Sequence, residues 1–110
     1  MRVDEYQQEA MTLLNPALMD KDVLMNALMG LCGESGEAID VMKKHLFQGH
    51  PLDRAKLMKE LGDVAWYLAE AATGLGVPLS EILQGNLDKL HARYPQGFDT
   101  NRSQNRETEA

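Results

Sequence analysis

A regular spacing of apolar residues between positions 57 and 75 constrains the fold more than any other feature of the chain. These residues recur at alternating intervals of four and three, and they are Leu57, Leu61, Val64, Leu68, Ala71 and Leu75. Residues three or four apart share one face of an α-helix, so the spacing predicts an amphipathic helix with one apolar stripe. The sequence shows no sustained alternation of apolar and polar residues, which would indicate strands. We therefore predict an all-α protein.

Turn-forming residues divide the chain into four predicted helices, over residues 3–14, 20–47, 53–75 and 80–93. Asn15-Pro16 ends the first helix, "QGHP" ends the second and "GLGVP" ends the third. Asp53 is the predicted cap of the third helix. The second helix has its own apolar stripe, formed by Leu24, Leu28, Leu31, Ala38 and Met42. This pattern is typical of a four-helix-bundle-like domain, which we place at residues 1–98. Residues 99–110 are polar and lack apolar periodicity, so we expect a disordered tail.

Composition excludes several classes of protein. The formal net charge is −6, and an acidic chain is poorly suited to sequence-independent binding of nucleic acid. No apolar run approaches the length of about 18 residues that a membrane span needs. The single cysteine, Cys32, cannot form an intrachain disulfide. These features predict a cytoplasmic protein that binds neither nucleic acid nor membrane.

Two pairs of acidic residues border the apolar stripes of the second and third predicted helices. Glu34 and Glu37 form one pair, and Glu60 and Asp63 form the other. The members of a pair are three residues apart and so share a helix face. The short "FQGHPLD" break favours antiparallel packing of the two helices, which places both pairs at a similar distance from the turn. We therefore expect four carboxylates to face one another, with Glu70, further along the same stripe, at the surface.

Such a cluster of carboxylates is unfavourable unless something compensates for the repulsion and burial of like charges. Oxygen ligands select hard divalent cations, so we expect Mg²⁺, with Mn²⁺ able to substitute. A di-iron site normally carries Glu-x-x-His pairs, which neither acidic pair contains. Since Mg²⁺ often completes its shell with substrate phosphates, a phosphate ester or anhydride is the expected ligand. The alternative for either pair alone is a solvated helix face.

Three glycines accompany the first acidic pair inside the second predicted helix: Gly30, Gly33 and Gly36. Each costs about 1 kcal/mol relative to alanine in a helix interior. We expect the missing side chains to let a neighbouring helix or a substrate approach the acids closely.

The segments "GESGEAID" and "KELGDVAWYLA" resemble the E-x-x-E … E-x-x-D signature of the MazG-like nucleotide pyrophosphohydrolases, which belong to the all-α NTP pyrophosphatase superfamily. The segment "NLDKLHARYPQGF", residues 86–98, is similar to the C-terminal N-x-x-K-L-x-x-R-Y-P-x-G-F of that family. The resemblance covers roughly residues 20–98 and implies the MazG fold in its short single-domain form.

Members of this family hydrolyse nucleoside triphosphates between the α and β phosphates, which gives a monophosphate and pyrophosphate. The resemblance implies that the metal ligands are Glu34, Glu37, Glu60 and Asp63. For the residue that activates the attacking water we favour Glu37. The resemblance also implies a homodimer or homotetramer and a role in clearing unwanted nucleotides.

Five further residues are candidates for binding substrate: Lys44, Asn86, Lys89, Tyr94 and Trp66. Lys44 lies on the stripe of the first acidic pair, and the resemblance places Asn86 and Lys89, in the predicted helix over residues 80–93, near substrate. Each candidate has a structural alternative. Lys44 would be a solvated cation at a helix end, Tyr94 a packing anchor, and Trp66 an aromatic residue in a helix seam.

Two other functions stay open beside the hydrolase. One is a non-catalytic helical module that dimerises or binds a nucleotide without turnover. The other is a dUTP- or dCTP-specific hydrolase on the same scaffold. A requirement for divalent metal separates the first from an enzyme, and the accepted base separates the second from a general hydrolase.

Overall fold

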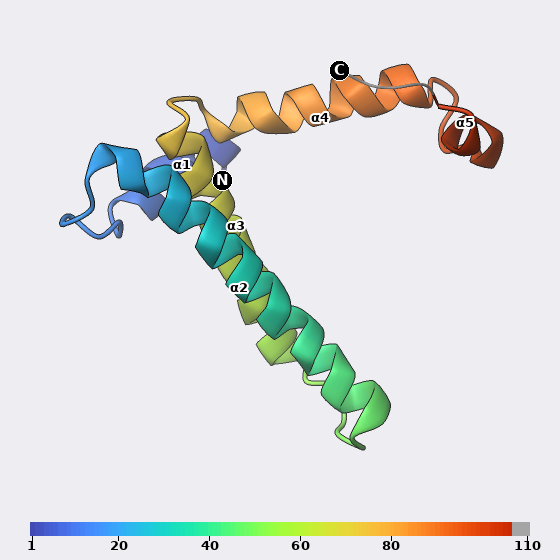
Figure 1. Ribbon diagram of the computed structural model, residues 1–110, viewed down its shortest axis with the longest axis horizontal. Coiled ribbons are helices and arrows are strands. Elements are labelled where there is room, and N and C mark those ends of the chain that lie inside the picture. Colours follow the sequence, from blue (N-terminus) through green and yellow to red (C-terminus); the bar gives the residue numbers. More distant parts are fainter. Residues whose placement is uncertain (107–110) are drawn as a thin grey trace. The chain divides into compact units, whose positions relative to one another are not determined.

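A computed structural model describes residues 1–106 of the chain. Within these residues it contains five helices and no strand: α1 (Val3–Met11), α2 (Asp20–Phe47), α3 (Arg54–Gly74), α4 (Leu79–Arg93) and α5 (Thr100–Gln104) (Figure 1). The prediction of an all-α fold is therefore confirmed. None of the helices in this part of the chain has the length and hydrophobicity needed to cross a membrane.

The helices α2 and α3 form an antiparallel hairpin in the first of two compact units, Met1–Leu79 (Figure 1). The observed bounds of α2 match the predicted range of 20–47. Gly49 makes the turn possible because its φ of 74° lies in the left-handed region, where glycine has no Cβ penalty. Asp53 then caps α3, as predicted, since its side chain accepts a hydrogen bond of 3.0 Å from the Lys56 amide.

The core of this unit lies where α1 meets α3. Its buried residues are Ala10, Ala69, Ala72 and Leu79, and partly buried residues that include Trp66 pack against them. The Trp66 indole Nε1 donates a hydrogen bond of 3.1 Å to the Ala10 carbonyl. The Gln7 side chain ties α1 to the residues after α3, because it donates to the Val77 carbonyl at 3.1 Å and accepts from the Leu79 amide.

The first helix ends at Met11, three residues before the predicted boundary at 14. The Thr12 hydroxyl donates to the Glu9 carbonyl at 2.6 Å, and the Asn15 side chain accepts from the Ala17 amide at 2.9 Å. Short polar side chains that bond to nearby backbone in this way compete with helix continuation. The chain therefore leaves the helix before it reaches Pro16.

The second unit begins at Ser80, within α4, and also contains α5. We predicted disorder from residue 99 onward, but residues Thr100–Gln104 form a helix. Its N-cap is Asp99, whose side chain accepts hydrogen bonds from the amides of Asn101 and Arg102 at 2.8 and 3.4 Å. A cap of this kind stabilises a short polar helix without apolar periodicity, which the composition argument overlooked. The rest of the predicted tail, residues 107–110, lies outside the described residues.

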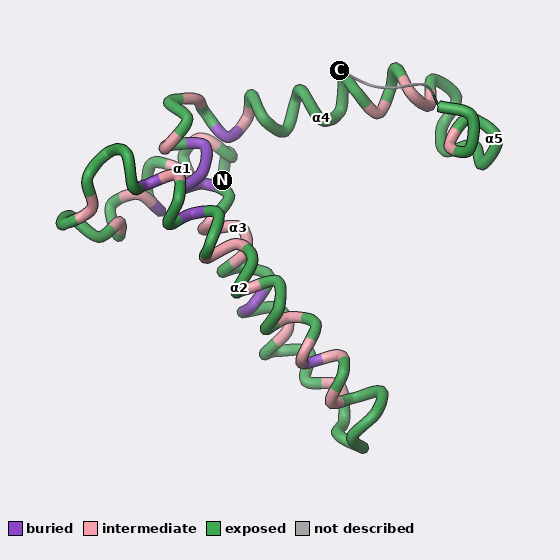
Figure 2. The backbone as a smooth tube through the Cα atoms, viewed as in Figure 1, coloured by how far each residue is buried: buried purple, intermediate pink, exposed green. Residues whose placement is uncertain are grey.

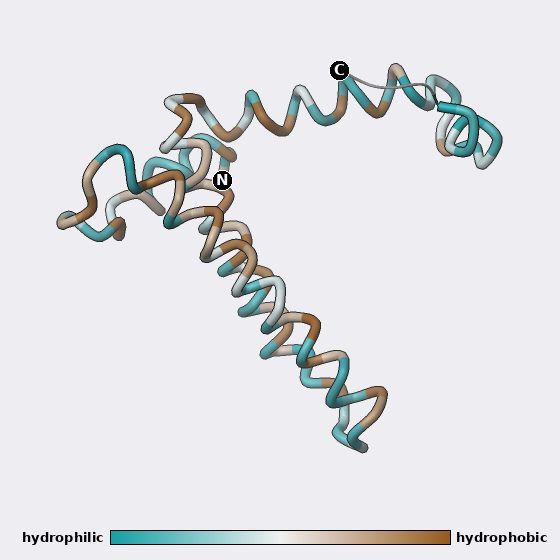
Figure 3. Tube along the Cα trace, in the orientation of Figure 1, coloured by the Kyte–Doolittle hydropathy of each residue, from teal (hydrophilic) through white to brown (hydrophobic). Residues whose placement is uncertain are grey.

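Only part of each predicted apolar stripe of α2 and α3 is buried in the single chain: Ala71 is buried, and Leu24, Leu31, Leu57 and Val64 are partly buried. Leu61 and Leu68 of α3 and Leu75 at its C-terminal cap are 55%, 36% and 58% exposed, and Leu28 of α2 is 49% exposed. Other buried positions lie on the stripes that carry the acids, where Ala27 of α2 and Glu70 of α3 are fully buried. Figure 2 shows that the buried positions along the hairpin are short and separated by exposed ones. Apolar segments consequently remain at the hairpin surface (Figure 3). Small residues on the acid-bearing stripe of α2, such as Ala27 and Gly30, explain why this stripe faces α3, because they let the two helix backbones approach closely.

Close packing at one end of the hairpin makes Gly74 sensitive to substitution. A Cβ at Gly74 would lie 2.8 Å from the backbone N and Cα of Leu24. We expect Gly74→Ala to lower the free energy of unfolding by about 1–3 kcal/mol, because backbone must shift to admit the methyl group. Urea denaturation measures this change.

The matched control for Gly74→Ala is Gly33→Ala, because a Cβ at Gly33 meets nothing within 4 Å. Removing a helical glycine in open space should stabilise the protein by up to about 1 kcal/mol. Equal effects of the two substitutions would contradict the close approach of α2 and α3 at Gly74.

Candidate active site

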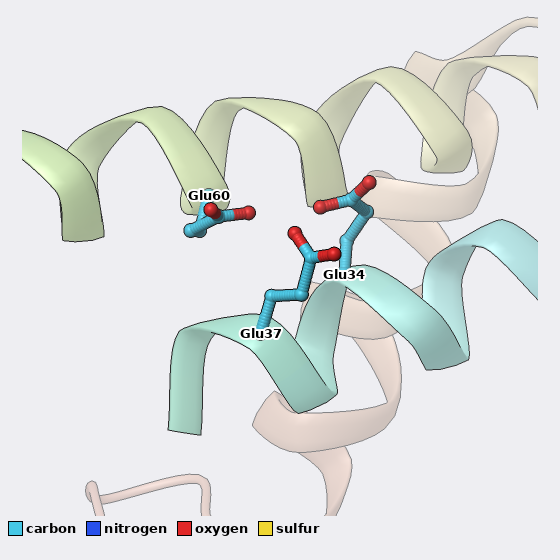
Figure 4. Close-up of side chains that lie close together, drawn as sticks. All are labelled: Glu34, Glu37 and Glu60. Carbon is cyan, nitrogen blue, oxygen red and sulfur yellow. The ribbon is translucent and has the colours of Figure 1, made fainter. Parts of the chain in front are cut away.

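The hairpin brings three carboxylates together from its two helices. Glu34 and Glu37 extend from α2 toward α3, which carries Glu60 (Figure 4). One carboxylate oxygen from each residue lies within 4.8 Å of the other two. Glu60 is buried, Glu34 is partly buried and Glu37 is exposed. The group therefore has a buried side and a side that a ligand can reach.

Two oxygens on the buried side of this group lack hydrogen-bond donors. They are Oε2 of Glu34 and Oε2 of Glu60, and neither has a partner among the described residues. A buried carboxylate oxygen without a donor carries a desolvation cost that nothing offsets. A divalent cation offsets this cost with its charge, and an all-oxygen donor set fits Mg²⁺ or Mn²⁺ better than softer metals. The residues present thus fit the metal that the sequence predicts.

The same crowding raises the pKa of Glu34 to about 7 from an ordinary value of 4.5. The main cause is Glu60, to which a protonated Glu34 can donate a hydrogen bond. Partial burial of Glu34 and the neighbouring Glu37 carboxylate add to the effect. In the absence of metal, a proton at Glu34 therefore relieves part of the repulsion within the group.

This raised pKa predicts how the stability of the metal-free protein depends on pH. The folded state holds the Glu34 proton more tightly than the unfolded chain does. The contribution of Glu34 to the free energy of unfolding should therefore be fully present below a pH of about 4.5 and be lost as the pH rises through about 7. Since a cation requires the ionised carboxylates, the rise in melting temperature caused by excess Mg²⁺ should be larger at about pH 8 than at about pH 5.

Thermal denaturation with and without Mg²⁺ at the two pH values measures this dependence. The control is Glu34→Gln, which removes the titrating group and should flatten the dependence of the metal-free protein on pH. A metal-induced shift in melting temperature that is the same at both pH values would contradict the assignment.

Asp63, the fourth predicted ligand, lies outside the group of three carboxylates. Its side chain is exposed, yet its charge is close enough to contribute to the raised pKa of Glu34. Aspartate has one methylene fewer than glutamate, so it reaches less far from the helix axis. The structure thus places Asp63 beside the three glutamates but not among them.

A cavity of about 580 Å³ adjoins the carboxylates, and its lining residues are Gly33, Gly36, Glu37, Asp40, Lys56 and Glu60. A Cβ at Gly33 or Gly36 would meet no atom within 4 Å, so these two glycines leave open space beside the acids. Gly30 differs, because a Cβ there would collide with the ring of Tyr67. The three glycines therefore have two roles. Gly30 makes room for Tyr67 of the neighbouring helix, and Gly33 and Gly36 border the cavity.

Lys44, a predicted substrate-binding residue, pairs with Asp40 at 3.2 Å. The hydrogen bond from Lys44 is the main reason that the pKa of Asp40 lies below its usual value. Lys44 also lines a second cavity of about 380 Å³ near the hairpin turn, together with His50 and Lys56. Its ammonium group is thus partly neutralised before any ligand arrives.

The other predicted substrate-binding residues lie elsewhere in the fold. Trp66 packs against the core and bonds to α1, which supports its structural alternative. Asn86 and Lys89 are exposed on α4. Tyr94 follows that helix and packs its ring against Phe98, with centroids 5.3 Å apart. Contact of the residues from the second unit with substrate stays a prediction.

The expectation that Glu70 lies at the surface is wrong, since Glu70 is fully buried. The Asn26 side-chain amide donates to both of its carboxylate oxygens, at 3.0 and 2.9 Å. The sequence analysis did not single out Asn26. One signal could have pointed to Asn26: Glu70 continues the stripe that carries Glu60 and Asp63, and a carboxylate buried on that stripe requires a hydrogen-bond donor.

Comparisons with known proteins agree with this arrangement. The family model described as "MazG nucleotide pyrophosphohydrolase domain" matches residues 24–98, a range that holds the three carboxylates and Asp63. A similar curated protein is the "Gene 37 protein" of Mycobacterium phage L5, which is 40% identical over 114 residues that cover 96% of this chain and 100% of that protein. No solved structure matches the chain. By the family match, this chain belongs to the MazG nucleotide pyrophosphohydrolase domain family.

Proposed function

We propose that the protein is a Mg²⁺-dependent nucleoside triphosphate pyrophosphohydrolase, with Mn²⁺ able to replace Mg²⁺. The observation that carries this proposal is the meeting of Glu34, Glu37 and Glu60 beside a cavity, with two buried oxygens that lack donors. In the reaction, one water is consumed and the bond between the α and β phosphates breaks. The products are a nucleoside monophosphate and pyrophosphate.

The proposed role of each acidic residue follows from how exposed its side chain is. Glu34 and Glu60, the less exposed pair, would hold the cation from the buried side, and the exposed Glu37 and Asp63 would be its other ligands. Glu37 is exposed and lines the cavity, so it is the carboxylate best placed to orient a water and accept its proton. The bound metal neutralises phosphate charge and lowers the pKa of the attacking water.

We further propose that the protein works as a homodimer or homotetramer. We call Leu61, Leu68 and Leu75 the leucine face; they recur every seven residues along α3 and at its C-terminal cap, and all are exposed in the single chain. Leucines exposed in such a regular row on one helix face are candidates for an interface with another chain. A seven-residue repeat of leucines is also a pattern by which helices of two chains pack. A second copy of the hairpin is therefore the proposed partner.

Product analysis tests the proposed activity. The purified protein is incubated with a panel of NTPs and dNTPs, including dUTP and dCTP, in the presence of Mg²⁺. We expect a monophosphate and pyrophosphate, and loss of both when the metal is chelated. Release of a diphosphate and orthophosphate instead would overturn the assignment of the cleaved bond.

The panel also separates the two alternatives. A non-catalytic helical module predicts no product with any nucleotide. A hydrolase specific for dUTP or dCTP predicts product with that nucleotide alone. We favour the broader enzyme and a role in clearing unwanted nucleotides.

A further inference from the structure

Asn26 of α2 and Glu70 of α3 form a polar contact between the two helices that the proposed reaction does not use. Glu70 is fully buried, and the side-chain nitrogen of Asn26, an exposed residue, donates to both of its carboxylate oxygens at 3.0 and 2.9 Å. Burial of a carboxylate is unfavourable unless hydrogen bonds replace the lost water. The position of Glu70 therefore depends on a donor from the opposite helix.

This contact moves together with the three glutamates. On α2, Asn26 lies eight residues before Glu34, and on α3 Glu70 lies ten residues after Glu60. Both separations lead away from the hairpin turn, as antiparallel helices require. Since a regular helix shifts largely as one body, a rotation or slide of α3 that separates Glu70 from Asn26 also displaces Glu60 from Glu34.

Apolar packing alone does not select this arrangement of the hairpin. Leu61 and Leu68 of α3 are 55% and 36% exposed, while the small residue Ala27 of α2 is fully buried. A turn of α3 about its axis that placed the leucines against α2 would remove more apolar surface from water. The same turn would carry the stripe that holds Glu60 and Glu70 away from α2. The polar contact favours the observed rotation instead.

We propose that Asn26 and Glu70 are positioning residues, which fix the rotation and register of α3 against α2 and thereby hold the three glutamates at the separation that a divalent cation requires; this inference rests on the proposed function. A polar contact that forms in one arrangement alone can specify how two helices pack. The pair acts through the glutamates and not on the substrate. A displacement of about 1 Å is enough to weaken a site of this kind tenfold or more.

Replacement of the pair by apolar residues of similar size separates positioning from stability. In the double variant Asn26→Leu/Glu70→Met no buried charge needs a partner, so the melting temperature should equal that of wild type or rise. The affinity for Mn²⁺, measured by calorimetric titration well below the melting temperature, should nevertheless fall about tenfold. A contribution to stability alone predicts no such loss in folded protein.

The exchanged variant Asn26→Glu/Glu70→Asn tests rescue. Glu70→Asn alone removes the carboxylate and shortens the contact, so it should show the loss of affinity. The exchanged variant restores one carboxylate and one amide across the same contact and should recover most of the affinity for Mn²⁺.

Thr73→Val is the matched control, because Thr73 joins α3 to a different helix. Its hydroxyl accepts a hydrogen bond of 3.1 Å from the Gln7 side chain of α1. Loss of this bond should lower the melting temperature and leave the affinity for Mn²⁺ unchanged.

The outcomes distinguish this inference from the function on which it rests. A folded apolar variant that binds Mn²⁺ as well as wild type would overturn the inference and leave the enzyme assignment standing. If wild type binds Mn²⁺ without turnover and the variants behave as expected, the enzyme assignment fails and the positioning role stands. If the apolar variant does not fold, recovery of affinity by the exchanged variant supports the inference, and no recovery overturns it. Absence of Mn²⁺ binding by wild type overturns both the inference and the proposed metal site.

Discussion

Glu37→Gln should abolish hydrolysis of nucleoside triphosphates while the fold remains intact. The substitution removes a negative charge from the group of three carboxylates and, in the proposed mechanism, the group that accepts a proton from water. Metal ligation and proton transfer together contribute several kcal/mol to transition-state stabilisation, so we expect a loss of about 1,000-fold or more in kcat. Asp63→Asn should also abolish turnover, because it removes a predicted ligand beside the group. Monophosphate release at saturating Mg²⁺ measures both effects.

Stability measurements separate this loss from unfolding. Glu37→Gln relieves repulsion on Glu34, one cause of the raised pKa, so the metal-free variant should be at least as stable as wild type. Glu9→Gln is the matched control, because Glu9 is an exposed acid on α1 outside the site, and it should keep full activity. Activity that survives both Glu37→Gln and Asp63→Asn would remove the basis for the assigned ligands.

Leu68→Asp should convert the proposed oligomer into a monomer. Leu68 is the central member of the leucine face and retains 36% exposure in the single chain. A charge placed within an apolar interface must be desolvated without a partner, at a cost of several kcal/mol in each chain. That cost is a large fraction of the association energy of a typical dimer, so dissociation at micromolar protein concentration is expected. Light scattering coupled to size exclusion measures the mass, with 12.3 kDa expected for the single chain.

Leu13→Asp is the control for the interface variant, because Leu13 is 76% exposed and lies in the turn after α1, away from the leucine face. It should leave the mass of the oligomer unchanged. A wild-type protein that already has the mass of one chain would show that the leucine face is not an interface between copies.

Helix periodicity predicted the elements of the fold well but did not predict which surfaces meet. The second helix was placed at its observed bounds, and Asp53 was correctly predicted to cap the third. The apolar stripe of the third helix is typical of a buried helix face, yet Leu61 and Leu68 are exposed in the single chain. Periodicity identifies the residues that share a helix face. Which face contacts the other helix depends on how closely the two backbones can approach, and here the small residues Ala27 and Gly30 allow a close approach.

The convergence of the acids was predictable for a different reason. Glu34, Glu37 and Glu60 lie at similar distances from a short turn, so an antiparallel hairpin brings them to a similar depth. Both pairs border the apolar stripes, which keeps them near the contact between the two helices. The burial of Glu70 was not predictable from the position of Glu70 alone. It depends on Asn26, whose amide supplies both hydrogen bonds from the other helix. Pairings across helices of this kind require the relative rotation of the two helices, which one sequence does not specify.

The end of the first helix and the cap of the last show a second limit. In both places a short polar side chain bonds to nearby backbone: Thr12 where the first helix ends, and Asp99 where the last begins. Such side-chain bonds to the backbone compete with the backbone bonds of a helix, so composition alone did not predict where these helices begin and end.

The central claim is that the three glutamates hold a divalent cation, and binding of Mn²⁺ followed by electron paramagnetic resonance tests it most directly. Free Mn²⁺ gives a strong signal that decreases when the ion binds protein, so titration yields the affinity without any assay of activity. We expect wild type to bind Mn²⁺, Mg²⁺ to compete for the same site, and Glu60→Gln to lose binding by at least about tenfold. Equal binding by wild type and Glu60→Gln, or none by wild type, would contradict the account.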